Sequence, residues 1–171
     1  MDRAPELAAF AAFIVALLPW SVSFSDGAFA ESVVVRFVFG VIELSFGARS
    51  LDMTRAAVPV TDIGSQYGGA LARVGTLWLV AAALLVVALV LALALVVAGE
   101  RLLVGALDPV RAMGVLCLGM AFVLSGATWL LWQQTSPVPI PIGVIALFLF
   151  GVGLLTVDRT HGTRMNAGAS G

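Results

Sequence analysis

The sequence has no lysine, only one cysteine (Cys117) and only one histidine (His161), and its charged residues are missing from long stretches. No charged side chain occurs within residues 7–25, 74–99 or 112–157. A single cysteine excludes an intramolecular disulfide and a cysteine-based metal site. All nine basic residues are arginines and the net charge is −1, so the chain lacks the basic surface that nucleic-acid binding requires.

What the chain has instead is apolar residues. Hydrophobic residues make up 61% of the sequence and charged residues 11%, whereas soluble domains average about 25% charged. A bilayer core about 30 Å thick is crossed by about 20 apolar residues in a helix. The sequence therefore predicts an all-α membrane protein, a four-transmembrane-helix bundle formed by a single domain over residues 1–171. The predicted spans are about 7–24, 75–98, 110–132 and 139–157, with an outer segment at 25–74.

The first apolar segment has two interpretations. Its length also suits a signal-peptide core, and Ala28-Phe29-Ala30 resembles a signal-peptidase site. A signal peptide begins with a positive region, whereas this chain begins with Asp2 and Glu6 against a single Arg3. We expect a retained helix, with cleavage after Ala30 as the alternative.

The arginines predict the orientation in the cell membrane. Arginines are denser in the short segments that carry the termini and Arg101 than in the outer segment, so the positive-inside rule places both termini in the cytoplasm. With this multi-pass topology all four tryptophans fall at the outer interface, where they would form an interfacial aromatic belt. These are Trp20, Trp78, Trp129 and Trp132.

The outer segment contains a run typical of strands. Residues 32–46 are rich in Val, Ile and Phe, which predicts a small β-hairpin that reverses at Phe39-Gly40 and places Arg36 opposite Glu43. One face of this hairpin would carry the apolar side chains and the other the charged pair. A helix with Arg36 and Glu43 two turns apart is the alternative. The pair is either an interaction site or a structural salt bridge.

The predicted spans offer packing surfaces rather than chemistry. Cys117, Ala121 and Ser125 recur at every fourth position of the third span, which is typical of a helix-packing face. A nucleophilic serine needs a neighbouring base, and no histidine or carboxylate lies within any span. We therefore expect no catalytic residue, no metal site and no cofactor.

Several short segments carry a resemblance to a known family. They are Leu18-Pro19-Trp20-Ser21-Val22-Ser23, Val35-Arg36-Phe37, Asp108-Pro109-Val110-Arg111-Ala112-Met113-Gly114, Pro139-Ile140-Pro141-Ile142-Gly143-Val144 and Leu155-Thr156-Val157-Asp158-Arg159. On these segments the chain resembles a family of small uncharacterised four-span integral membrane proteins from haloarchaea. The resemblance implies a full-length four-span protein and a salt-adapted origin, and it brings no activity.

Together these features predict a non-catalytic protein embedded in the lipid bilayer. We expect an interaction or accessory subunit that binds a membrane protein partner. A small transporter or channel is the main alternative, and it would need a continuous polar cavity between the helices. A membrane enzyme is a further alternative, and it would need polar residues gathered at the outer interface around Ser21, Arg36, Glu43 and Gln133.

Overall fold

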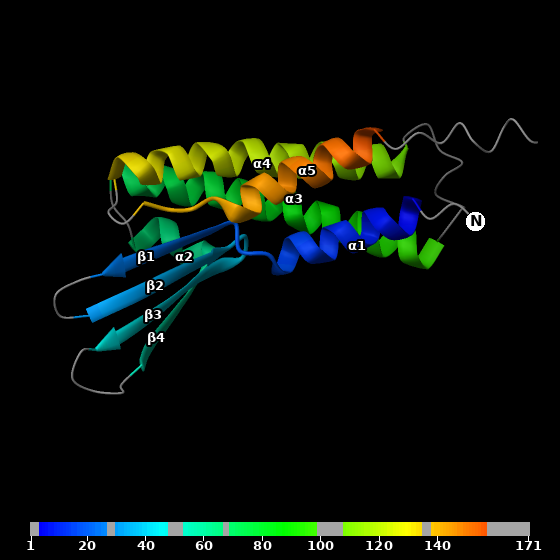
Figure 1. Cartoon of the computed structure of the whole chain (residues 1–171). Coiled ribbons are helices and arrows are strands. Elements are labelled where there is room, and N and C mark those ends of the chain that lie inside the picture. The colour runs from blue at the N-terminus through cyan, green and yellow to red at the C-terminus, as the bar shows by residue number, and fades with distance from the viewer. Residues whose placement is uncertain are drawn as a thin grey trace, which may run out of the picture.

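The computed structural model describes residues 4–26, 30–47, 53–66, 69–98, 108–134 and 138–156, and the structural statements below concern these residues. They form a bundle of helices with a four-stranded antiparallel sheet that projects from one end (Figure 1). The elements in chain order are α1 (Ala4–Leu17), β1 (Ser21–Asp26), β2 (Ala30–Phe37), β3 (Gly40–Gly47), β4 (Met53–Pro59), α2 (Val60–Gln66), α3 (Ala70–Ala98), α4 (Pro109–Gln134) and α5 (Ile142–Thr156).

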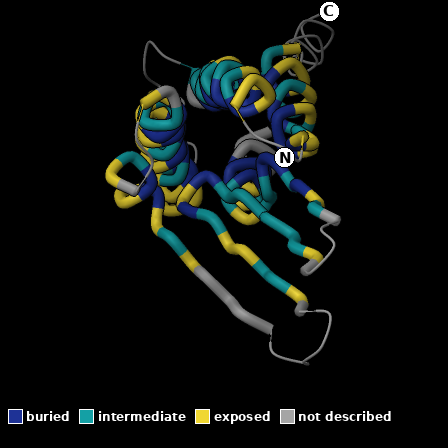
Figure 2. The backbone as a smooth tube through the Cα atoms, turned by 90° about the vertical axis from the view of Figure 1, so that its left-hand side faces the viewer, coloured by how far each residue is buried: buried dark blue, intermediate teal, exposed yellow. Residues whose placement is uncertain are grey.

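The two longest helices, α3 and α4, pack along each other and form the centre of the bundle. Their buried positions alternate three and four residues apart, the spacing of a helix seam with a period of 3.5 residues. In α3 these positions are Val74, Trp78, Ala81, Leu85, Ala88, Ala92 and Leu95, and in α4 they are Val110, Met113, Cys117, Met120, Leu124, Ala127 and Leu131. In the view along the bundle, buried positions face one another and exposed positions face outward (Figure 2).

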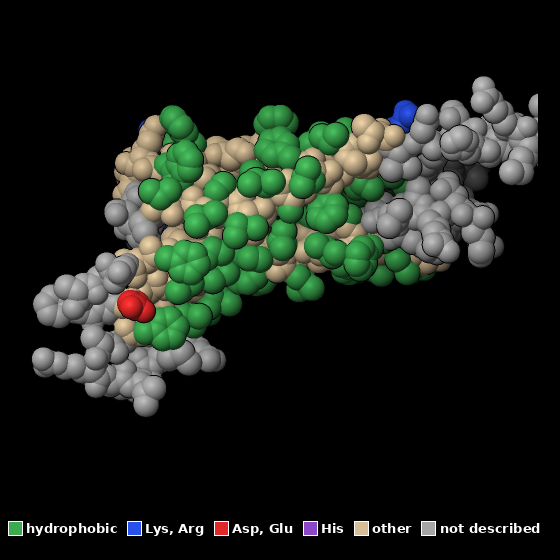
Figure 3. Space-filling model, viewed as in Figure 1, with side chains coloured by type: hydrophobic (Ala, Val, Ile, Leu, Met, Phe, Trp, Pro, Cys, Tyr) green, Lys and Arg blue, Asp and Glu red, His purple; other side chains and the backbone are tan. Residues whose placement is uncertain are grey.

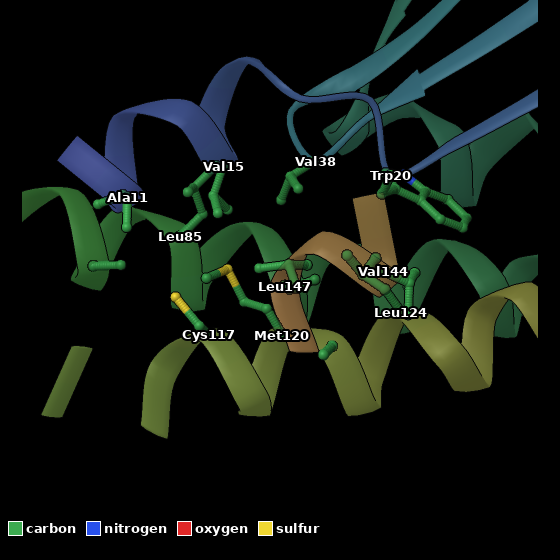
Figure 4. Packing of buried hydrophobic residues seen from close by; sticks show 14 of the residues in the cluster. Ala11, Val15, Trp20, Val38, Leu85, Cys117, Met120, Leu124, Val144 and Leu147 are labelled. Atoms are coloured by element: carbon green, nitrogen blue, oxygen red, sulfur yellow. The ribbon is translucent and has the colours of Figure 1, made fainter. Parts of the chain in front are cut away.

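The interior of the bundle is closely packed. Ala81, Ala88 and Ala92 on α3 are fully buried, which lets the helix backbones approach closely. Larger side chains fill the remaining space, and the cluster joins Val15 of α1, Leu85 of α3, Met120 of α4 and Leu147 of α5 (Figure 4). On α4, Asp108 Oδ1 accepts a hydrogen bond from the Val110 amide at 3.0 Å, so the helix is capped and begins at Pro109.

The predicted four-span bundle is wrong. Among the helices of the described residues, only α3 and α4 are long and apolar enough to cross a membrane. The described part of α1 has 14 residues and that of α5 has 15, which gives each a length of only about 21–23 Å at 1.5 Å per residue. The predicted spans 7–24 and 139–157 were too long because apolar residues at their sheet-side ends are extended: Ser21–Asp26 form β1, and Ile140 bridges Val22.

The predicted hairpin is present as β2 and β3, but it belongs to a larger sheet with strand order β1-β2-β3-β4. The turn residues are Val38 and Phe39, one position earlier than predicted, so Arg36 pairs with Val41 and Glu43 with Val34. The predicted direct Arg36–Glu43 pairing is therefore wrong. Both residues still lie on one face, because moving the turn by one residue shifts each cross-strand partner by two positions.

Candidate interaction site at the junction of sheet and helices

The sheet turns one face towards the helices and leaves the other uncovered by described residues. The pairing register puts small and polar residues on the helix-facing face: Ser21, Ser23, Val34, Arg36, Val41, Glu43 and Val58. The opposite face, called the open face below, carries Val22, Phe24, Val33, Val35, Phe37, Ile42, Leu44 and Phe46, and also the exposed Glu31, which pairs with Phe46. Alternation with a period of two along each strand separates the two sets.

A partly open cavity of about 140 Å³ lies between the helix-facing face and the helices. Its sheet wall carries two charged residues, Arg36 and Glu43, among valines. Its helix wall is apolar and consists of Ile63, Leu71, Val74, Trp78 and Leu131. Pockets for drug-sized ligands occupy about 300–1,000 Å³. This smaller cavity suits one or two side chains of a binding partner, with charged groups on one wall.

The Arg36 side chain is positioned by a buried serine. Its Nη1 donates a hydrogen bond to Ser23 Oγ at 2.6 Å, and Ser23 is fully buried. Arg36 itself is half-buried. A charged donor held against a fixed acceptor keeps its guanidinium in one place, which pre-organises it for a carboxylate or another anion. Glu43 is exposed on the same face and provides the opposite charge.

Two tryptophans, Trp20 and Trp78, hold the sheet against the helix bundle. Trp78 Nε1 donates to the backbone oxygens of Phe37 at 2.8 Å and Val38 at 3.0 Å, next to the β2–β3 turn. The ring of Trp20 meets the ring of Trp78 edge to face, with centroids 5.0 Å apart. Val38 is buried in the same core, with Trp20 nearby (Figure 4). The turn of the hairpin is therefore fixed at the sheet end of the bundle.

The predicted aromatic belt does not hold for all four of its members. Trp20 and Trp78 are buried, at 1% and 3% exposure, so neither reaches an interface. Trp129 and Trp132 are exposed, and Trp132 Nε1 donates to the backbone oxygen of Pro139 at 3.0 Å. The belt prediction is thus wrong for the first pair, whose hydrogen-bonding and ring contacts lie inside the protein.

The predicted helix-packing face lies on α4 and is largely buried. Cys117 and Ala121 are fully buried, and Ser125 is half-buried with its Oγ donating to the Ala121 backbone oxygen at 2.7 Å. A serine that donates to the carbonyl four residues earlier is satisfied within its own helix. This geometry is compatible with a packing role for Ser125.

Sequence reasoning missed Ser23 as the residue that positions Arg36. The pattern Ser21-Val22-Ser23-Phe24-Ser25 alternates as strands do, and this signal lay inside an apolar run assigned to a helix. Among the described residues, no group of three His, Cys, Asp or Glu side chains could hold a metal ion. An ion pair between Arg111 Nε and Asp108 Oδ2, at 3.7 Å, lies at the first turn of α4.

Comparison with known proteins identifies the family of this chain. Residues 2–159 match the family described as DUF7549, a family of unknown function. The chain belongs to the DUF7549 family. No curated protein matches the sequence. Membership agrees with the resemblance to an uncharacterised family, while the haloarchaeal origin stays a prediction.

Proposed function

We propose that this DUF7549 protein is a non-catalytic interaction or accessory subunit embedded in a membrane through α3 and α4. The observation that carries the proposal is the apolar outer surface of the bundle. Large hydrophobic side chains are exposed on all its long helices (Figure 3). They include Phe10 and Phe13 of α1, Val86, Val90, Leu93 and Val97 of α3, Phe122 of α4, and Ile145 and Leu149 of α5.

This surface does not fit a water-soluble helical domain. The core helix of a soluble protein is mostly buried. In the most apolar 18-residue stretch of α3, by contrast, only 28% of the residues are buried. Within that helix Ala81, Ala88 and Ala92 are fully buried among a few larger residues, and the large exposed residues are valines and leucines. Small residues inside and large apolar residues outside are typical of helices that pack within lipid. Exposing such a continuous apolar surface to water would cause aggregation.

The charges support one orientation across the membrane. Arg111 lies at the end of the bundle opposite the sheet, and Arg101 belongs to the connection between α3 and α4. The positive-inside rule places this end in the cytoplasm, and with it the first described turn of α1 and the last described turn of α5. The sheet and the cavity then lie on the outer side. Both chain termini would be cytoplasmic.

The cavity supports an interaction role over transport. The α3–α4 seam is filled by fully buried side chains such as Met113, Cys117 and Met120, which favours a packed bundle over a channel. The cavity beside Arg36 and Glu43 lies at the sheet end and suits charged side chains of a partner. In this proposal Arg36 binds a carboxylate of the partner and Glu43 binds a basic group.

The proposal is tested by capture from native membranes. Membranes that contain the tagged protein are washed with alkaline carbonate, crosslinked, and solubilised in a mild detergent before the tag is captured. We expect the protein to remain in the washed membranes and to capture a neighbouring membrane protein. Capture should fall several-fold in Arg36→Ala and in Glu43→Gln, because each removes one charged contact of the cavity.

One further variant and one control accompany this test. Ser23→Ala removes the hydrogen bond that positions Arg36 but keeps the guanidinium, so capture should fall less than in Arg36→Ala. Arg111→Ala is the control: it removes a charge at the opposite end of the bundle and should capture the neighbour as well as the wild type. Release of the protein by carbonate would contradict membrane embedding. Equal capture by all variants would contradict the role given to the cavity.

A further inference from the structure

The open face of the sheet is largely apolar, with the exposed Glu31 opposite Phe46 at the end away from the turn. Phe24 is 60% exposed on this face and Phe46 is 38% exposed, with Val33 and Leu44 between them in the sheet. At the turn, Phe39 is exposed and its ring stacks on that of Phe37, with centroids 5.2 Å apart. Contiguous apolar patches of this kind on a protein surface mark contact with another molecule or with lipid.

This arrangement reverses the usual packing of a sheet on helices. An antiparallel sheet normally turns its apolar face to the core and its polar face to water. Here the serines, Arg36 and Glu43 face the helices, whereas the phenylalanines face away, with Glu31 opposite Phe46. The apolar residues of the open face are therefore placed to contact something outside the chain.

The tilt of the strands decides which way the open face points. The strands leave the end of the bundle at an angle to its axis (Figure 1). Because of this tilt, the open face is inclined towards the apolar outer surface of the bundle. Three residues separate the exposed Leu17, at the end of α1, from the start of β1, and Leu17 continues this surface up to the sheet. Hydrophobic side chains extend from the bundle onto the sheet in the space-filling view (Figure 3).

We propose that the open face rests on the outer leaflet of the same membrane, with Phe24 and Phe46 inserted among the phospholipid headgroups. The inference rests on the proposed membrane embedding of α3 and α4. The occupant is a phospholipid surface, because the open face continues the lipid-facing surface and is inclined towards it. Burying these rings removes apolar area from water, the same driving force that holds amphipathic elements at interfaces.

The experiment compares the lipid contact of two consecutive residues of one strand, which lie on opposite faces of the sheet. Phe46→Cys and Ser45→Cys are made in a Cys117→Ala background, labelled with an environment-sensitive fluorophore, and reconstituted into phosphatidylcholine and phosphatidylglycerol vesicles. Ser45 precedes Phe46 on β3 and lies on the helix-facing side. Brominated phospholipids should quench the fluorophore at position 46 strongly and that at position 45 weakly. Phe24→Cys and Ser25→Cys form a second pair on β1, should either variant of the first pair fail to fold.

Val90→Cys separates this inference from the proposed function. Val90 is exposed near the middle of α3, so its fluorophore must be quenched by brominated lipids if the helix crosses the membrane. Quenching at 90 and at 46 supports the inference. Quenching at 90 with none at 46 or 24 overturns it and leaves the embedding intact. No quenching at 90 contradicts the embedding itself. A second copy of the chain could cover the open face instead of lipid. In that case brominated lipids would not quench a fluorophore at position 46, and unlabelled Phe46→Cys would form a disulfide between two chains. This result would overturn the inference.

Discussion

Trp20 and Trp78 occupy the same buried contact but differ in their hydrogen bonding. The Trp78 indole donates to two backbone oxygens at the β2–β3 turn. The Trp20 Nε1 has no hydrogen-bond partner although it is buried. A buried donor without a partner costs about 1–3 kcal/mol relative to a satisfied one. The two rings therefore stabilise the junction similarly by packing. The indole N–H of Trp78 adds to the stability through its hydrogen bonds, whereas the unpaired N–H of Trp20 lowers it.

This difference predicts unequal effects of one conservative substitution. Trp78→Phe removes the donor to Phe37 and Val38, whereas Trp20→Phe removes only an unpartnered donor. Both leave a similar gap in the ring contact. We expect Trp78→Phe to lower the free energy of unfolding by about 1–3 kcal/mol more than Trp20→Phe does. The free energy of unfolding of each variant is measured by denaturation with sodium dodecyl sulfate in mixed micelles. Equal decreases for the two variants would contradict the hydrogen-bond assignment.

At the residue scale the sequence could not separate buried tryptophans from interfacial ones. Each of the four lies at the end of an apolar run, which is also where interfacial tryptophans occur. Burial of Trp20 and Trp78 depends on a sheet that approaches from a distant part of the chain. Cys117 was placed correctly on a packing face, because small residues four positions apart carry a local signal.

The start of α5 is fixed by a close approach of two backbones. A Cβ atom at Gly143 would lie 2.6 Å from Trp20 Cα and 3.0 Å from the Pro19 carbonyl carbon. The Gly143 amide also donates to the Trp20 backbone oxygen at 3.2 Å. Only glycine allows this contact, which sets the first turn of α5 against the chain between α1 and β1.

Two alanine substitutions on α5 test this contact. Gly143→Ala should destabilise the protein by about 1–3 kcal/mol, because backbone atoms must move to admit the methyl group. Gly153→Ala is the matched control: no atom lies within 4 Å of the added Cβ, so the change should be neutral or stabilise by up to about 1 kcal/mol. Thermal unfolding in detergent compares the two variants. A neutral Gly143→Ala would refute the close approach.

The elements with a local signal were predicted well. The hairpin face was correct because it depends only on the alternation of Val33, Val35 and Phe37 against Arg36. The predicted start of the span at about residue 110 lies within one residue of the start of α4, because Asp108 and Pro109 are a local helix-start signal. β1 was missed because its residues continue the apolar run of α1 without a break in hydrophobicity. β4 was missed because its residues, Met53–Pro59, show no strong strand pattern.

At the scale of the whole molecule the number of spans was overestimated. Counting apolar residues measures how long a segment is, and it does not report where the chain leaves the helical conformation. Pro19 and the Pro137–Pro141 run mark these points, but the helices on either side were extended past them. The strand β1 follows α1 directly in the sequence, and nothing in their composition marks where one ends and the other begins. Tertiary contacts such as the Val22–Ile140 bridge set this boundary.

The proposed orientation predicts which parts of the protein a protease reaches from outside the cell. A protease-cleavable tag inserted after Ser50, between β3 and β4, should be cut in intact cells because the sheet lies on the outer side. The same tag at the C-terminus should be protected until the cells are lysed, because positive residues retain that side in the cytoplasm. Cleavage is followed by immunoblotting. The reverse pattern would contradict the orientation.

The bridge between Val22 and Ile140 also limits how this sheet could polymerise. Two backbone hydrogen bonds, of 3.1 and 2.8 Å, occupy part of the outer edge of β1, while β4 pairs only with β3 among the described residues. Filament growth by strand addition needs two usable edges, one to receive each new copy and one to offer to the next. Next to Val22 the outer edge of β1 is closed to a new strand, which leaves β4 as the freer edge for a second copy. Association through β4 alone would stop at two chains.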